Sequence, residues 1–138
     1  MAHEFRLRVY YEDTDAGGVV YYANYLKFAE RARTEALLGL GISQSELHER
    51  LGLLFVVKGI AVDYRAPARL EDRLVVRTRL TGLGAARILM EQQILREAEL
   101  LVRCDVALAC IGPEGRPARM PASLRETIAS LKAAEPRD

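Results

Sequence analysis

The amino-acid sequence predicts an α+β fold in which an antiparallel sheet curls around one long helix. Three observations lead to this prediction. Apolar residues recur at helical spacing over residues 20–38, four strand-like segments follow between residues 53 and 110, and short turns join these segments. Neighbouring strands with short links pair antiparallel, and one apolar helix is buried best by a sheet that wraps around it.

The first elements along the chain are a strand and the long helix. Residues 5–10 alternate apolar and polar side chains, which is typical of a strand. From about residue 20 to residue 38, apolar positions every three or four residues predict a helix that is buried around much of its girth. Gly39 and Gly41 are expected to end this helix. Ser43 and Glu46 form a capping-box pattern, which predicts a short second helix.

Four strands are predicted after the second helix. Residues 53–65 begin as an apolar run and settle into alternation, and residues 74–80 alternate up to a glycine turn. Residues 86–96 form the next segment. Residues 100–110 show the clearest period of two in the chain, so this strand is expected to have one buried face.

The chain closes with a turn and a short helix. Gly112-Pro113-Glu114-Gly115 has strong turn chemistry. Ser123 and Glu126 form a second capping-box pattern, which predicts a helix to about residue 134. No internal repeat, low-complexity segment or linker interrupts the sequence, and residues 1–138 are expected to form a single domain.

The composition narrows the class of protein. Half of the 138 residues are hydrophobic and 28% are charged, as in ordinary globular proteins. A formal net charge of +1 provides no bulk attraction for nucleic acid or for an anionic membrane surface. The first residues carry charges where a signal peptide needs an apolar run, and no stretch is apolar enough to span a membrane. We therefore expect a cytoplasmic protein with no nucleic-acid partner and no membrane insertion.

The cysteines and histidines predict neither a disulfide nor a metal site. Cys104 and Cys110 lie six residues apart in one predicted strand. That spacing separates their Cα atoms by roughly 20 Å, too far for a bridge. The chain has no CxxC motif, and His3 and His48 are its only histidines. The two cysteines are expected to be buried small apolar side chains.

One stretch, residues 11–25, concentrates the chemistry of the chain. It holds three acids, two adjacent glycines and four tyrosines between the first strand and the long helix. Gly17-Gly18 indicates a sharp turn or a close contact with a ligand. A carboxylate, a glycine turn and a helix N-terminus in succession are the parts of an anion-stabilising site. Aspartate also favours turns and helix starts, so Asp15 alone can be a turn residue.

The same stretch and the segments after it match a known family pattern. The matching segments are residues 8–21, 24–25, 28, 30–35, 55–57 and 64–68. An acid, a glycine turn, an aromatic helix start and a downstream Glu-Arg-Ala-Arg occur there at the family spacing. In these residues the chain closely resembles the 4-hydroxybenzoyl-CoA thioesterase family. The nearest branch is that of the Tol-Pal-associated acyl-CoA thioesterases.

The resemblance implies a hotdog fold, in which a five-stranded antiparallel sheet wraps around a long central helix. Protomers of such proteins join edge to edge, so a homodimer or a homotetramer is expected, with active sites at the dimer interface. The implied activity is hydrolysis of an acyl-CoA thioester to free acid and CoA, for a short-chain or aromatic acyl group. Coenzyme A is then part of the substrate, and no separate cofactor is expected.

The resemblance also implies roles for residues of the motif. Asp15 is expected to act either as a nucleophile that forms a mixed anhydride or as a general base on water, and both routes stay open. The backbone N–H of Tyr22 is the expected oxyanion donor. Gly17 and Gly18 let the thioester approach the backbone. Asp13 is expected to be structural and to accept hydrogen bonds from loop N–H groups.

Other residues are expected to bind the acyl group and the phosphates of CoA. By family position, Leu54, Phe55, Val56 and Val57 line the acyl pocket of the partner protomer. Arg87, Arg116 and Arg119 are candidate phosphate ligands because they lie near predicted turns. The chain departs from its nearest branch at Tyr22, where many members have histidine. A backbone donor survives that exchange, whereas a mechanism that needs an imidazole at this position is excluded.

Two other functions are compatible with the fold that the resemblance implies. A 3-hydroxyacyl dehydratase generally needs a histidine paired with the acid, and the motif contains none. A non-catalytic module that binds acyl-CoA or acyl carrier protein, associated with envelope or lipid metabolism, is the main alternative. The intact Asp15-Ala16-Gly17-Gly18 argues against it, because mere binding does not need the carboxylate. A serine triad is not indicated, since no GxSxG occurs.

Overall fold

The computed structural model describes residues 2–132. Its strands are β1 (His3–Arg8), β2 (Leu54–Tyr64), β3 (Arg73–Leu83), β4 (Arg87–Arg96) and β5 (Glu99–Ile111). Its helices are the 3-10 turn η1 (Tyr11–Asp13), α1 (Asn24–Gly39), α2 (Gln44–Leu51) and α3 (Ala122–Ala129).

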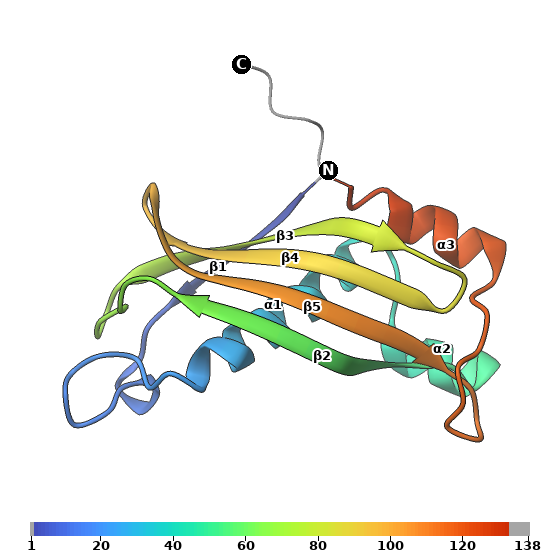
Figure 1. Cartoon of the computed structure of the whole chain (residues 1–138), viewed down its shortest axis with the longest axis horizontal. Coiled ribbons are helices and arrows are strands. Elements are labelled where there is room, and N and C mark those ends of the chain that lie inside the picture. The colour runs from blue at the N-terminus through green and yellow to red at the C-terminus, as the bar shows by residue number, and fades with distance from the viewer. Residues whose placement is uncertain (1, 133–138) are drawn as a thin grey trace, which may run out of the picture.

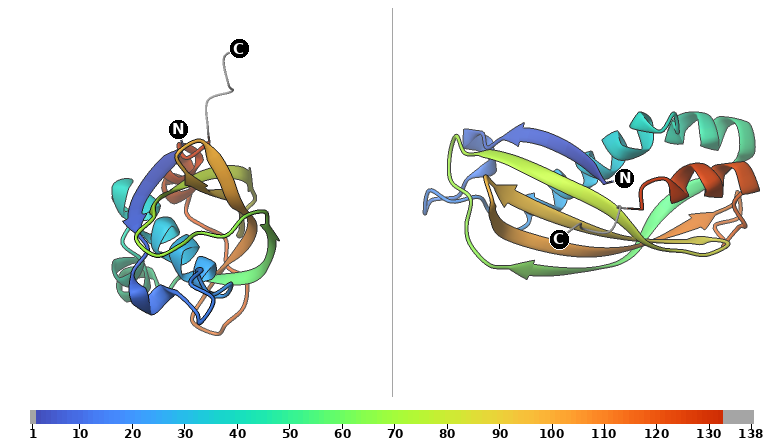
Figure 2. Two further views of the ribbon diagram at one scale, coloured as in Figure 1. Left: turned by 90° about the vertical axis from the view of Figure 1, so that its left-hand side faces the viewer. Right: turned by 90° about the horizontal axis from the view of Figure 1, so that it is seen from above.

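The five strands form one antiparallel sheet in the order β1-β3-β4-β5-β2. The sheet curves around α1, the longest helix of the described chain, which lies in its concave face (Figures 1 and 2). The α+β architecture predicted from the sequence is confirmed. Both edges of the sheet, β1 and β2, are left without a partner strand within the described chain.

The core lies between α1 and the concave face of the sheet. Phe28, Ala29, Ala32 and Ala36 are buried on the face of α1 that packs on the strands. Three of these four side chains are alanine, and such small side chains let a helix backbone lie close to a sheet. Alternate residues of β3, β4 and β5 fill the other side, as the period of two in the sequence predicts.

The long helix begins later than the sequence predicts. Apolar residues fit helical spacing from residue 20, but α1 starts at Asn24. The N–H of Val20 donates to the carbonyl oxygen of Ala68 at 2.9 Å, and the N–H of Tyr21 donates to that of Asp13 at 2.9 Å. These backbone bonds to distant segments replace the helical ones. Residues 20–23 therefore belong to the loop that precedes α1.

The predicted helix caps had different outcomes. Ser43 caps α2 as expected, because its Oγ accepts the N–H of Glu46 at 3.3 Å. The prediction that Ser123 caps α3 is wrong. Pro121 occupies the N-cap, so Ser123 lies inside the first turn. The carbonyl oxygen of Ser123 accepts the hydroxyl of Thr127 at 2.9 Å. The predicted helix end at residue 134 lies outside the described residues.

Both cysteines are free and buried, as the sequence predicts. Burial raises the pKa of the Cys104 thiol to about 11. No group of three His, Cys, Asp or Glu side chains in residues 2–132 could hold a metal ion. Over the same residues, no helix has the length and apolar character that crossing a bilayer requires.

Candidate active site

The loop between η1 and α1 is a closed turn at one end of the sheet, at the left of Figure 1. The N–H of Asp15 donates to the carbonyl oxygen of Val19 at 2.9 Å, and the N–H of Gly18 donates to that of Asp15 at 3.0 Å. Thr14 and Val20 form an isolated antiparallel bridge at the base of the loop. The sequence motif therefore folds into a compact loop with its own backbone hydrogen bonds.

The two glycines fit the geometry of this loop. Gly18 has a φ of +79°, in the left-handed region that side chains rarely adopt. A Cβ added at Gly17 would lie only 3.2 Å from Oδ1 of Asp15. Gly18 accordingly supplies the left-handed backbone of the turn, and a side chain at Gly17 would crowd the carboxylate of Asp15.

Asp15 is exposed, and the loop holds one of its two carboxylate oxygens. Its Oδ1 accepts the N–H of Gly17 at 2.8 Å. Within the described chain, Oδ2 accepts no hydrogen bond. The side chain is thus oriented by its own turn, and one oxygen remains available to a water molecule or a substrate.

Asp13 has the structural role that the sequence predicts. It is buried, with 6% of its surface exposed. Its Oδ2 accepts the N–H of Tyr10 at 2.8 Å, and its Oδ1 accepts the Nδ2 amide of Asn24 at 2.6 Å. Asp13 therefore joins Tyr10, two residues after the end of β1, to the first residue of α1, and both of its carboxylate oxygens are engaged.

The peptide N–H of Tyr22 points away from the start of α1. The N–H of Asn24 donates to the carbonyl oxygen of Tyr21 at 2.8 Å, so that carbonyl points toward the helix. The carbonyl of Tyr21 and the N–H of Tyr22 belong to one trans peptide group, in which the two bonds point in opposite directions. No acceptor in residues 2–132 bonds to the N–H of Tyr22. This loop thus presents an unpaired backbone donor beside the helix N-terminus, where the helix dipole favours negative charge.

Tyr64 belongs to the same site, although it was absent from the predicted site residues. Its hydroxyl donates to the carbonyl oxygen of Tyr22 at 3.0 Å. Its ring lies edge-on to the rings of Tyr22 and Tyr25, with centroids 6.2 Å and 5.7 Å apart. Desolvation by burial raises the pKa of Tyr64, which keeps this hydroxyl a neutral donor. In the sequence, the only signal was its place in a segment that matches the family pattern.

The apolar residues predicted for acyl binding lie on the edge strand β2 and point to both faces of the sheet. Directly opposite residues of an antiparallel pair share a face. Phe55 pairs with the buried Cys110, and Val57 pairs with the buried Leu108, so these two lie on the concave side. Leu54 and Val56, the other two predicted residues, alternate to the opposite face.

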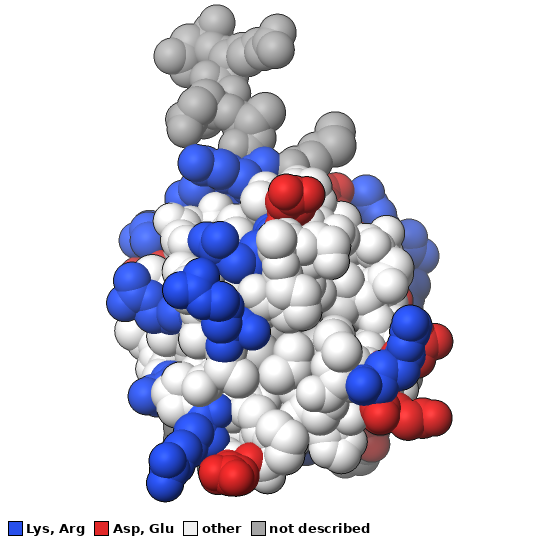
Figure 3. All heavy atoms as spheres, turned by 90° about the vertical axis from the view of Figure 1, so that its right-hand side faces the viewer, with Lys and Arg blue, Asp and Glu red and all other residues white. Residues whose placement is uncertain are grey.

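The three arginines predicted to bind phosphate lie in segments at the same end of the sheet. Arg87 is the first residue of β4, and Arg116 and Arg119 lie between β5 and α3. Backbone bonds from Ala118 to Cys110 at 2.9 Å and from Met120 to Ala85 at 2.8 Å run this connection beside the start of β4. Lys and Arg side chains gather on one side of this end (Figure 3). No carboxylate of residues 2–132 forms an ion pair with any of the three arginines.

Comparison with known proteins decides the family. Residues 9–128 match the family model described as the thioesterase-like superfamily. The chain belongs to this superfamily. It is 45% identical over 129 residues to the acyl-CoA thioesterase YbgC of Haemophilus influenzae, a match that covers 93% of this chain and 95% of that one. The predicted family and branch are thereby confirmed, together with the predicted enzyme class of thioester hydrolase.

Solved structures show the same hotdog fold. A probable thioesterase from Bartonella henselae is 40% identical, with a TM-score of 0.84 over 88% of this chain and 100% of that one. Slr0204 from Synechocystis, a 1,4-dihydroxy-2-naphthoyl-CoA thioesterase, is 28% identical, with a TM-score of 0.87 over 95% of this chain and 98% of that one. The fold class predicted from the sequence is therefore confirmed.

The segments that carry Arg87, Arg116 and Arg119 and the loop of residues 14–23, here called the Asp15 loop, lie at opposite ends of the sheet. The loop is at the left of Figure 1, whereas the β3–β4 turn and the connection from β5 to α3 are at the right. Strand β2 alone, with 11 residues, spans about 35 Å between the two ends. One protomer by itself therefore does not bring these arginines to Asp15.

Proposed function

We propose that this chain hydrolyses acyl-CoA thioesters to a free acid and CoA, with Asp15 as the nucleophile or general base. The proposal rests on the geometry of the loop between η1 and α1. It holds an exposed carboxylate by one oxygen, and it presents the unpaired N–H of Tyr22 at the start of α1. The 45% identity to a YbgC acyl-CoA thioesterase over most of the chain supports the same substrate class.

Two chemical routes are open to Asp15. As general base, the carboxylate takes a proton from water while the water oxygen attacks the carbonyl carbon of the thioester. As nucleophile, it attacks that carbon directly, and water then hydrolyses the mixed anhydride. In each route the carbonyl oxygen gains negative charge before the C–S bond breaks and the CoA thiolate leaves. The N–H of Tyr22 stabilises that oxygen, and loss of one such donor typically costs about 3–4 kcal/mol in the barrier.

We propose an aromatic or short-chain acyl group as the substrate. The rings of Tyr21, Tyr22, Tyr25 and Tyr64 form a contiguous aromatic cluster beside the loop. A flat acyl group gains edge-on or offset contacts from such rings. The fold neighbour Slr0204, a 1,4-dihydroxy-2-naphthoyl-CoA thioesterase, provides an aromatic precedent at 28% identity.

We further propose that the complete site needs two copies of the chain, as a homodimer or a homotetramer. The edge strand β2 exposes Leu54 and Val57, and in the described chain its outer edge has no partner strand. Antiparallel pairing of two β2 edges about a two-fold axis reverses one protomer relative to the other. The end with Arg87, Arg116 and Arg119 would then face the Asp15 loop of the other protomer. These arginines are the proposed ligands of the CoA phosphates.

A panel of thioesters tests the proposed activity. Aliphatic and aromatic acyl-CoAs and acyl-carrier-protein thioesters are presented to the wild type and to Asp15→Asn, and released thiol is followed. Because the amide neither attacks nor takes the proton, we expect turnover by Asp15→Asn to fall by at least about 100-fold. Glu12→Gln is the matched control, since Glu12 is an exposed acid three residues away.

The same panel separates the enzyme from a binding module. A module that binds acyl-CoA or acyl carrier protein without turnover would retain the thioester and release no thiol. The proposal fails if the wild type releases none, or if Asp15→Asn is as fast as Glu12→Gln. The preferred carrier, CoA or acyl carrier protein, is the one with the higher kcat/KM.

A further inference from the structure

We propose that Arg96 and Asp72 form a clamp that positions the Asp15 loop for catalysis. Neither residue lies in the loop, and neither contacts Asp15. The inference deepens the proposed function and rests on it, because it assigns the two residues a positioning role for the reaction of Asp15.

The Asp15 loop is hydrogen-bonded to the segment that connects β2 to β3. The N–H of Val20 donates to the carbonyl oxygen of Ala68 at 2.9 Å, and Val19 forms an antiparallel bridge with Arg69. The carbonyl oxygen of Val19 in turn accepts the N–H of Asp15 at 2.9 Å. A shift of residues 68–69 would therefore reach the backbone of Asp15 through two successive backbone hydrogen bonds.

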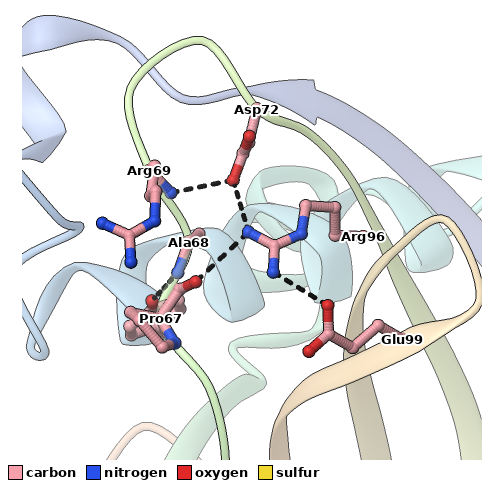
Figure 4. A network of polar contacts seen from close by, with 7 residues as sticks. Pro67, Ala68, Arg69, Asp72, Arg96 and Glu99 are labelled. Atoms are coloured by element: carbon pink, nitrogen blue, oxygen red, sulfur yellow. Dashed lines mark hydrogen bonds and ion pairs between the residues drawn. The ribbon is translucent and has the colours of Figure 1, made fainter.

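Arg96, the last residue of β4, holds this connecting segment from the other side (Figure 4). Its Nη1 donates to the carbonyl oxygen of Pro67 at 3.3 Å and to Oδ2 of Asp72 at 2.8 Å. Its Nη2 donates to Oε1 of Glu99 at 2.8 Å. The planar guanidinium thus joins three partners with one side chain, which a lysine ammonium cannot reproduce in the same geometry.

Asp72 links the arginine to the residue that touches the loop. Its Oδ2 accepts the N–H of Arg69 at 2.8 Å as well as Nη1 of Arg96. Burial alone would raise the pKa of the Asp72 carboxyl, but the N–H of Arg69 and the guanidinium of Arg96 outweigh burial and lower it. Asp72 therefore remains a charged acceptor at neutral pH.

Two further observations show that external contacts hold this segment. The N–H of Ala68 donates to the hydroxyl oxygen of Tyr25, a buried residue of α1, at 2.9 Å. Glu71 has a φ of +70°, which is rare for a residue with a side chain and persists only where the surroundings impose it. The connection between β2 and β3 is thus fixed to α1 as well as to Arg96 and Asp72.

The test compares Arg96→Lys with a matched control on the same sheet. Arg79→Lys alters an ion pair of the same length, because Nε of Arg79 lies 2.8 Å from Oε1 of Glu91, and within residues 2–132 its side chain makes no hydrogen bond or ion pair with the Asp15 loop. We expect Arg96→Lys to lower kcat by about 10-fold while KM changes by less than about 2-fold. We expect Arg79→Lys to retain both parameters within about 2-fold. Hydrogen exchange should be faster in Arg96→Lys at the amides of Asp15 and Val20.

The outcomes separate this inference from the proposed function. The clamp is refuted if Arg96→Lys keeps the wild-type kcat, or if it lowers only the melting temperature and leaves exchange at Asp15 and Val20 unchanged. If Arg96→Lys does not fold, Asp72→Asn, which keeps the side-chain shape, is judged by the same two measurements. If Asp15→Asn stays active, the proposed function fails, and faster exchange at those amides in Arg96→Lys would then show only that Arg96 holds the loop, without a role in the reaction of Asp15.

Discussion

The hydroxyl of Tyr64, at the end of β2, donates a 3.0 Å hydrogen bond to the carbonyl oxygen of Tyr22, at the entrance to α1. The bond joins residues 42 positions apart in the sequence. It ties the edge strand proposed as the dimer interface to the peptide segment that carries the proposed oxyanion donor. The proposed dimer interface and the proposed oxyanion donor are thereby linked through one side chain.

Removal of this hydroxyl should affect catalysis more than folding. In Tyr64→Phe we expect kcat to fall several-fold, because the Tyr22 segment loses an anchor while the aromatic wall remains. A neutral hydrogen bond contributes about 0.5–1.5 kcal/mol, so the loss of stability should stay within that range. Thiol release and urea unfolding measure the two effects. Tyr11→Phe, which alters a side chain with 82% of its surface exposed, should change neither.

Replacement of Asp13 should affect stability directly. Asp13→Ala leaves the buried Nδ2 amide of Asn24 and the partly buried N–H of Tyr10 without their acceptors. We expect a loss of about 1–3 kcal/mol in the free energy of unfolding, measured by urea denaturation. Glu12→Ala removes the adjacent exposed carboxylate and should cost far less. Equal costs for the two variants would contradict a structural role for Asp13.

The clamp carboxylate should make stability depend on pH. The pKa of Asp72 is lower in the folded protein than its ordinary value of 3.8, so its contribution is complete above that value and is lost as the pH falls through the folded pKa. The difference in melting temperature between wild type and Asp72→Asn should therefore be largest near neutral pH and shrink below about pH 4. Asp63→Asn removes an exposed partner of Arg65 and should have little effect at any pH. A constant difference across the pH range would contradict the assignment.

The buried thiol of Cys104 should be inert in the native protein. With a pKa of about 11, only about 0.1% of it is thiolate at pH 8, and the thiolate is the reactive form. Ellman's reagent should detect no fast-reacting thiol in the folded protein and two after denaturation, since Cys110 is also buried. Fast labelling of Cys104 in the native state would show that the sheet opens at β5.

Local sequence patterns were sufficient for most of the secondary structure. The alternation in residues 100–110 predicted β5 to within one residue at each end, because buried strands show their period in the sequence. The start of α1 was predicted too early, since residues 20–23 fit helical spacing but the N–H groups of Val20 and Tyr21 bond to Ala68 and Asp13 instead. Such competition between local and long-range hydrogen bonds leaves no periodic signal.

The sequence by itself determined the family, the sheet around one helix and the motif that carries Asp15 and Tyr22, because these depend on residue types at short, regular spacings. Only the tertiary structure decided that Tyr64 contacts Tyr22, that Arg96 supports the segment behind the loop, and that the arginines lie at the opposite end of the protomer. Each of these relationships joins residues distant along the chain. Their contact depends on how the sheet curves around α1, and no short-range pattern records that curvature. The proposed role of Asp15 therefore follows from the sequence motif, whereas the contacts that support its loop follow only from the fold.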